Sequence, residues 1–242
     1  RFLLNLLLPQ PPPVVALEHM SAAEFHSSVP PLPAQPREWV LALFPYTDPL
    51  VKTAVWEVKY RGNSAVARLM GELLADELAA WLVELSETEN FRAPLLVPIP
   101  LAKGRFAARG FNQCELLAYA MFPTLEHMAE VNMRALVKIK ETESQTKSGD
   151  RKARLRNLAG CFAVKEPAAI QNRNVVLLDD VTTTGATLFE ARRALLAAGA
   201  RYKPARYIRQ GSSWQREWLE GDDVRNFFGI EISRDGRAAV YL

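Results

Sequence analysis

The stretch NVVLLDDVTTTGAT, residues 174–187, decides the fold. Its apolar run, residues 175–178, is unbroken and rich in valine and leucine, which predicts a strand covered on both faces of a parallel sheet. After two acids and a threonine-rich turn, apolar residues return at helical spacing at Leu188, Ala191, Leu195 and Ala198. Gly199 then ends the pattern. The stretch therefore predicts an α/β domain in which a strand passes through a short loop into a helix.

The loop between this strand and helix favours an anion. Backbone N–H groups at a helix start have no helical partner, and the helix dipole is positive there. The predicted phosphate and ribose contacts are Thr182, Thr183, Thr184, Gly185, Ala186 and Thr187. Asp179 and Asp180 are not phosphate ligands, since like charges repel, but they suit the hydroxyls of a phosphorylated sugar, or a metal. The pattern indicates a ribose 5-phosphate held at both ends.

Other phosphate-binding patterns fit the chain less well. It contains no GxxxxGK[ST], and no GxGxxG follows a strand-like run. The alternative is an ordinary strand-to-helix turn in which the acids cap the helix. The segment resembles the signature of type I phosphoribosyltransferases. That resemblance implies that Asp179 and Asp180 bind the ribose hydroxyls of phosphoribosyl pyrophosphate, and that residues 183–187 bind its 5-phosphate.

The composition is that of a soluble globular protein. The chain has 242 residues, of which 49% are hydrophobic and 24% charged, and a net charge of +3, too small by itself to indicate a nucleic-acid partner. Cys114 and Cys161 are far apart, so neither a disulfide framework nor a zinc site is predicted. The apolar segment 2–8 is too short to span a membrane. We expect a cytoplasmic protein.

The chain divides into three predicted parts. Residues 1–38 are proline-rich and predict a linker or wrapping arm. Residues 39–208 form the main domain, with a strand-like segment at 39–44, a short helix at 49–60, a long amphipathic helix and a second buried strand at 95–100. Hood elements are expected near residues 39–62. Residues 209–242 carry no functional motif, and either add strands at a sheet edge or pack on a neighbour.

A basic loop is predicted directly after the second strand. Lys103, Arg105 and Arg109 lie within seven residues, and a helix over 113–122 follows. Beside a sugar-phosphate loop, such a segment is interpreted as a pyrophosphate loop, because guanidinium and ammonium groups bind phosphates. The alternative is a solvated basic loop.

A second basic segment spans residues 134–156. It holds eight Lys and Arg against three acids, a net charge of +5. Its polar centre, residues 141–149, suits a mobile loop that closes over a charged substrate, with Lys138, Lys140 and Gln145 as candidate contacts. The alternatives are a solvated hairpin with a basic helix, or a nucleic-acid contact through Arg154 or Arg156.

Taken together, these segments resemble the ComF family, phosphoribosyltransferase-like proteins associated with competence and DNA uptake. The motifs occur in the family's order and spacing: KYRGN (59–63), VPIPL (97–101), RGFNQ (109–113), ESQTKSGDRKARLRN (143–157) and VVLLDDVTTTGATL (175–188). The resemblance implies a type I phosphoribosyltransferase-like parallel sheet with helices on both faces and an N-terminal hood. The family-pattern positions outside the phosphate loop are Lys59, Arg105, Arg109, Gln113, Gln145, Arg151 and Asn157.

The chain departs from this family in two respects. Members commonly open with a cysteine-rich zinc module, but no cysteine precedes Cys114, so no structural zinc is expected. Members also usually end soon after the turn that corresponds here to residues 198–200, whereas this chain continues to Leu242.

The resemblance implies a chemistry with Mg²⁺ bound to phosphoribosyl pyrophosphate and no direct protein ligand to the metal. In it, Asp179 and Asp180 hold the ribose, while Arg105, Arg109 and Lys138 or Lys140 take the departing charge. Either the chain transfers a phosphoribosyl group to an unidentified acceptor, or it is a non-catalytic sensor of a nucleotide or ribose phosphate. Single-stranded DNA, DNA-uptake proteins and a second copy of the chain are further candidate partners.

Overall fold

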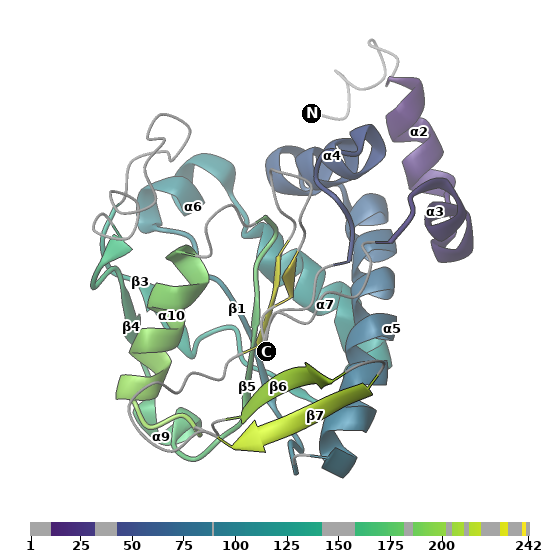
Figure 1. Ribbon diagram of the computed structural model, residues 1–242. Coiled ribbons are helices and arrows are strands. Elements are labelled where there is room, and N and C mark those ends of the chain that lie inside the picture. Colours follow the sequence, from purple (N-terminus) through teal and green to yellow (C-terminus); the bar gives the residue numbers. More distant parts are fainter. Residues whose placement is uncertain are drawn as a thin grey trace.

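The computed structural model describes residues 11–31, 43–88, 90–141, 158–181 and 186–201, and the backbone of the strands at 205–210, 213–218, 228–231 and 239–240. Several predicted site residues therefore lie outside the described residues: Thr182, Thr183, Thr184, Gly185, Gln145, Arg151, Arg154, Arg156 and Asn157. Figure 1 shows the arrangement of the described elements around one central sheet.

The central sheet has the order β2-β1-β5-β8-β9, with β2 at Glu130–Val131, β1 at Leu95–Pro98, β5 at Val175–Leu178, β8 at Phe228–Glu231 and β9 at Ala239–Val240. All neighbours are parallel except β9, which runs antiparallel to β8. Strands β1 and β5 are buried along their whole length, as their apolar runs predict. Strand β1 ends at Pro98, two residues before the predicted end. Its register with β5 pairs Pro98 with Leu178, so the two strands end together.

Each face of this sheet carries its own hydrophobic core. Leu96, Val176 and Leu178 pack with α5 (Ser64–Thr88) and α7 (Gln113–Leu125). On the opposite face, side chains of the alternating strand positions pack with α10 (Ala186–Ala197) and with the antiparallel pair β3 (Leu136–Lys138) and β4 (Phe162–Val164). Figure 1 shows α10 and the α5–α7 pair on opposite sides of the sheet. The predicted α/β class with helices on both faces is confirmed.

Helices α5 and α7 approach each other closely. A Cβ atom placed on Gly71 would lie 2.4 Å from the Cβ of Ala120, so only glycine allows this helix crossing. The predicted apolar stripe of α5 faces this contact and the sheet. Its buried members are Val66, Leu69, Met70, Leu73, Leu74, Leu78, Leu82 and Leu85.

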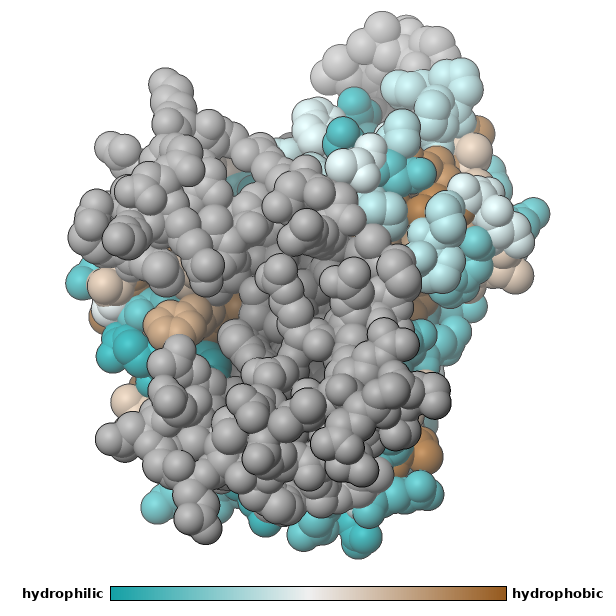
Figure 2. All heavy atoms as spheres, in the orientation of Figure 1, coloured by the Kyte–Doolittle hydropathy of each residue, from teal (hydrophilic) through white to brown (hydrophobic). Residues whose placement is uncertain are grey.

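The proline-rich N-terminal part is not an unstructured linker where it is described. It forms α2 (Pro12–His19), which begins with proline, and α3 (Ala22–Ser28), which begins with a capping box between Ser21 and Glu24. Leu17 and Phe25 are buried in the same core as α5. Figure 2 shows a hydrophobic strip among the hydrophilic side chains of this region, at upper right. The prolines begin and flank these helices rather than preventing them, and the segment packs as an arm.

A hood over the carboxyl end of β5 follows the arm. Helix α4 (Pro49–Trp56), capped by Asp48, continues directly into a π-helix, η1 (Glu57–Arg61), which ends at Gly62 with φ of 61°. This confirms the helix predicted at 49–60. The strand-like segment predicted at 39–44 is described only from Leu43 onward, and Leu43 and Phe44 are not in a strand. Phe44 instead packs edge-on against Phe25, with ring centroids 5.0 Å apart.

The predicted basic loop after β1 is a helix. Helix α6 spans Lys103–Arg109 and ends at Gly110, whose φ of 84° terminates it. The two alanines before Arg109 favour helix, and Gly104 does not break it. The basic residues therefore extend from a regular element rather than from a loop.

Three further described elements lie outside the central sheet. They are α9 (Pro167–Ile170), β6 (Ala205–Gln210) and β7 (Ser213–Trp218), the last two forming a separate antiparallel pair. Strands β8 and β9 extend the central sheet from the C-terminal segment. Among the helices of the described residues, none combines the length and the apolar character needed to cross a bilayer.

Candidate functional site

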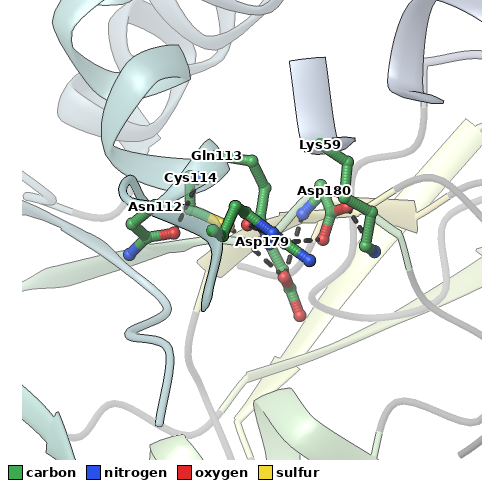
Figure 3. A network of polar contacts seen from close by, with 7 residues as sticks. Lys59, Asn112, Gln113, Cys114, Asp179 and Asp180 are labelled. Atoms are coloured by element: carbon green, nitrogen blue, oxygen red, sulfur yellow. Dashed lines mark hydrogen bonds and ion pairs between the residues drawn. The ribbon is translucent and has the colours of Figure 1, made fainter. Parts of the chain in front are cut away.

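The candidate site is built on the two acids that follow β5. Strand β5 pairs with β1 through Leu178, and the backbone N–H of Ile99 still donates to the Leu178 carbonyl at 2.8 Å. Asp179 and Asp180 come next, where the strand leaves the sheet, and both are buried. Figure 3 shows their carboxylates facing side chains from η1 and from the start of α7. The acids therefore face inward, beneath the hood.

Asp180 is held by two side chains from different elements. The Lys59 ammonium of η1 lies 2.5 Å from Oδ2 of Asp180. The side-chain amide of Gln113, at the first position of α7, donates to Oδ1 at 3.1 Å. The carboxylate is thus fixed in orientation from both sides (Figure 3).

Asp179 is held by the start of α7 and by its own neighbour. Its Oδ1 accepts from the backbone N–H of Asp180 at 2.9 Å and from the Cys114 thiol at 3.5 Å. Asn112 sets the position of Cys114, because it caps α7 by accepting from the Cys114 backbone N–H at 3.0 Å. The Asn112 amide also donates to the carbonyl of Ile99 at 3.0 Å, which ties α7 to the end of β1.

Burial and charge shift the titration of these groups in opposite directions. Burial, with the nearby charge of Asp180, raises the pKa of Asp179 to about 7. Burial acts on Asp180 too, but the Lys59 ammonium and the hydrogen bonds outweigh it and lower the pKa of Asp180. Burial and the adjacent Asp179 raise the pKa of the Cys114 thiol, so it remains a donor. At neutral pH the site holds an ionised Asp180 beside an Asp179 that is close to its midpoint.

The same residues are the metal-ligating group found among the described part of the chain. Ligand atoms of Cys114, Asp179 and Asp180 lie within 4.8 Å of one another. A directly bound Mg²⁺ does not fit this set well. The Lys59 ammonium already lies against Asp180, and a protonated thiol is not among the oxygen ligands that Mg²⁺ prefers.

Arg109 joins the site through Gln113. Its guanidinium donates to the side-chain oxygen of Gln113 and lies over the ring of Tyr60, 5.4 Å from the ring centroid. Tyr60 neighbours Lys59 on η1. Arg109 of α6 therefore contacts the hood through Tyr60 and contacts α7 through Gln113, and both Lys59 and Gln113 contact Asp180. The family motifs KYRGN (59–63) and RGFNQ (109–113) also touch directly, because the Phe111 ring packs against Gly62. A Cβ placed on Gly62 would lie 3.0 Å from a carbon of that ring.

The other predicted contacts are more dispersed. Lys103 is exposed on the first turn of α6, where the Gly104 backbone N–H donates to the Glu141 carboxylate at 2.7 Å. Burial lowers the pKa of Lys138; Cys161 opposes this shift, and the charge of Arg105 adds to it. Lys138 also lies over the Phe162 ring at 5.5 Å.

The last predicted residues lie after β3 and at the start of α10, and two residues of the site were not predicted. Lys140 donates to the carbonyl of Ala159 at 3.1 Å, and Ala186 and Thr187 begin α10. Asn112 and Cys114 were not singled out as site residues from the sequence, although they flank the family position Gln113. Their place inside RGFNQC was the available signal.

The fold is that of a phosphoribosyltransferase-like α/β protein, with a parallel sheet flanked by helices. No family model matches the chain, but curated relatives do. It is 30% identical over 169 residues to the "DNA utilization protein YhgH" of Escherichia coli (strain K12), covering 69% of this chain and 70% of that protein. It is also 30% identical over 159 residues to the "Competence protein ComFC" of Bacillus subtilis (strain 168), covering 65% of this chain. The chain belongs to the ComF family.

The matches do not extend over the full length of these relatives. The chain spans 58% of the Bacillus subtilis protein and 63% of the ComFC of Streptococcus pneumoniae (strain ATCC BAA-255 / R6), to which it is 29% identical over 161 residues. What these whole proteins do is therefore carried to this chain only as a proposal.

Proposed function

We propose that this chain binds phosphoribosyl pyrophosphate, or another ribose 5-phosphate ligand, at the carboxyl end of β5, within a role in DNA uptake or utilisation. The observation that carries the proposal is the buried acid pair just before the start of α10, in which Lys59 and Gln113 fix Asp180 in place. The role in DNA handling rests on the printed names of the relatives.

Two features of the acid pair suit a ribose. Ionised carboxylates are acceptors only, with about four lone-pair positions each, so Asp180 can accept from sugar hydroxyls while it keeps Lys59 and Gln113. Its partners fix it before the ligand arrives, which lowers the ordering cost of binding. The phosphate would lie toward α10, against Thr187 and residues 182–185, because the start of a helix favours an anion.

Positive charge near the acids suits a pyrophosphate. Lys59 is beside Asp180, Arg109 is linked to Asp180 by two hydrogen bonds through Gln113, and the charge of Arg105 acts on Lys138. In this proposal Mg²⁺ arrives with the pyrophosphate, whose charge it neutralises, and has no direct protein ligand. Arg105, Arg109 and Lys138 or Lys140 are the cations proposed to receive the departing charge.

Binding is tested by calorimetry. Phosphoribosyl pyrophosphate, with and without Mg²⁺, and ribose 5-phosphate are titrated into the full chain and into Asp180→Asn. The matched control is Asp76→Asn, a charge change at an exposed position of α5. We expect binding to the parent chain and the control, and a loss of ten-fold or more in Asp180→Asn. Equal binding by all three proteins would contradict the proposed site.

A second assay separates transfer from sensing. Pyrophosphate release is followed with a panel of free bases and amines under the same conditions. Release that depends on an acceptor and disappears in Asp180→Asn supports a phosphoribosyltransferase. Binding of phosphoribosyl pyrophosphate without pyrophosphate release supports a non-catalytic sensor, in which the same acids bind the ligand.

A further inference from the structure

The outer surface of the hood carries two large aromatic rings that its core does not use. Trp56 is 49% exposed and Tyr60 is 50% exposed, and their ring centroids lie 5.0 Å apart at 48°. A guanidinium lies at each end of the pair: that of Arg61 is 5.8 Å from the Trp56 ring, and that of Arg109 is 5.4 Å from the Tyr60 ring. We call these four residues the aromatic ladder.

The helical geometry of the hood creates this arrangement. Trp56 ends α4 and Tyr60 lies in η1, four positions later, so both rings fall on one side of the turn. Lys59 lies on the other side and reaches Asp180. Arg61 is fixed from below by Glu57, which is buried and lies 3.3 Å from the guanidinium. The ladder is therefore held in place by neighbours, yet its rings remain accessible.

We propose that the aromatic ladder binds single-stranded DNA by stacking its bases on Trp56 and Tyr60. Every base has a π-face, so exposed aromatic rings bind single strands with little dependence on sequence. Arginines beside the rings supply both cation–π contact and phosphate neutralisation. A row of two rings with a cation at each end fits successive nucleotides better than one enclosed base.

The ladder is continuous with the acid pair. Arg109 contacts Tyr60 on one side and Gln113 on the other, and Gln113 donates to Asp180. A strand on the ladder thus lies next to the proposed ribose-phosphate site and shares one arginine with it. The proposal nevertheless does not depend on that site, because stacking on Trp56 requires none of the acids.

The described cations of the basic segment 134–156 offer a weaker surface. Lys138 is partly buried against Phe162, and Lys140 donates to the carbonyl of Ala159. Both ammonium groups are thus engaged at the β3–β4 pair, although Lys140 is exposed, and the third described cation of the segment is the exposed Arg134. In the ladder, by contrast, two half-exposed rings contact each other and each ring has a guanidinium group beside it.

The test is fluorescence anisotropy with a labelled twelve-base oligothymidylate and the full chain, without phosphoribosyl pyrophosphate. Trp56→Leu and Tyr60→Leu are each expected to weaken binding roughly 5- to 150-fold, the loss of one stacked base. Trp56→Phe keeps a ring and should restore most of the affinity. The matched control, Tyr119→Leu, removes a ring that is 65% exposed on α7 and is not one of the four ladder residues, and this variant should bind as the parent does.

Salt dependence distinguishes stacking from charge. Trp56→Leu should lower affinity without changing the slope of log affinity against log salt, whereas Arg61→Ala should reduce that slope by roughly 0.7. Circular dichroism of each variant checks that the hood is folded. Asp180→Asn should retain DNA binding even where it loses ribose phosphate, so the two proposals fail independently.

Three results would overturn the proposal. The first is parent-like affinity in a folded Trp56→Leu/Tyr60→Leu double variant. The second is binding that only Arg154→Ala/Arg156→Ala abolishes, which assigns DNA to the basic segment. The third is affinity for a mononucleotide or a duplex equal to that for the oligothymidylate, since neither presents a row of free bases.

Discussion

The two sides of η1 differ in how they are used. On the inner side, the Lys59 ammonium meets a buried carboxylate 121 positions away in the sequence. On the outer side, Trp56 and Tyr60 contact each other and flanking guanidinium groups, and half of each side chain remains exposed. The polar group of the inner side has its partner within the protein, whereas the rings of the outer side remain accessible to a ligand.

This difference separates two kinds of recognition within one turn of helix. The inner side is a buried polar cluster, in which each lost partner leaves a charge unsatisfied. The outer side is a surface whose removal costs the fold little, because exposed substitutions usually change stability by only about 0.5 kcal/mol. The π-turn, a form often found at functional positions, lets one short segment serve both. Substitutions on the inner side should therefore change stability, and those on the outer side should change binding.

The largest effect is expected from Lys59→Met. The substitution leaves the buried Asp180 carboxylate without its ammonium, and the Lys59 side chain is only 26% exposed. We expect the free energy of unfolding at pH 7 to fall by about 3 kcal/mol, the usual cost of removing one partner of a buried pair. Urea denaturation measures it.

A double-mutant cycle tests the cause of this loss. In Lys59→Met/Asp180→Asn neither charge remains, so much of the stability should return, and the two effects should be strongly non-additive. Additive losses would contradict the pairing of these two groups as the source of the effect.

A second effect on the inner side depends on pH. The pKa of Asp179 is raised to about 7, whereas an aspartate in the unfolded chain has a pKa of about 4. The native state thus holds a proton that the unfolded state releases, and stability should fall as pH rises from about 4 to about 7. Asp179→Asn removes this titration, so the variant should gain roughly 2 kcal/mol relative to the parent between pH 5 and pH 7.5.

This pH effect is measured by urea denaturation at both pH values, with Asp76→Asn as the control for a change of net charge. Asp180, whose pKa is lowered, titrates below this window and should not contribute to the difference. A difference between variant and parent that is the same at pH 5 and pH 7.5 would show that Asp179 is ionised throughout.

The sequence predicted those parts of the inner side that local patterns encode. The strand at 175–178, the helix that follows it and the long helix α5 are confirmed, because each has an apolar period that packing then follows. The family class is likewise confirmed. Local patterns did not predict the elements whose formation depends on tertiary packing. Helices α2 and α3 are flanked by proline and are stabilised by burying Leu17 and Phe25. Helix α6 forms where charge and glycine predicted a loop.

The site was predicted less completely than the fold. The acids at 179 and 180 follow from their place after a buried strand, but no local signal shows that Cys114 meets Asp179 or that Lys59 meets Asp180. These contacts join residues 65 and 121 positions apart, so they depend on how the hood and α7 are placed over the sheet. The aromatic ladder was not predicted from the sequence for a related reason. Only the folded structure shows that Trp56 and Tyr60 are exposed, unlike the aromatic residues of the core.

The smallest stability effect is expected at Gly62, the residue that ends η1. Gly62 ends η1 with φ of 61°, and a Cβ there would lie 3.0 Å from the Phe111 ring. Gly62→Ala should cost about 1 kcal/mol for the left-handed backbone and somewhat more for the contact. Gly110→Ala is the matched control: its φ is 84°, but a Cβ there meets nothing within 4 Å. Urea denaturation should therefore rank Gly62→Ala below Gly110→Ala in stability. The reverse order would mean that Phe111 does not hold the hood against α7, and that the two sides of η1 are positioned independently of RGFNQ.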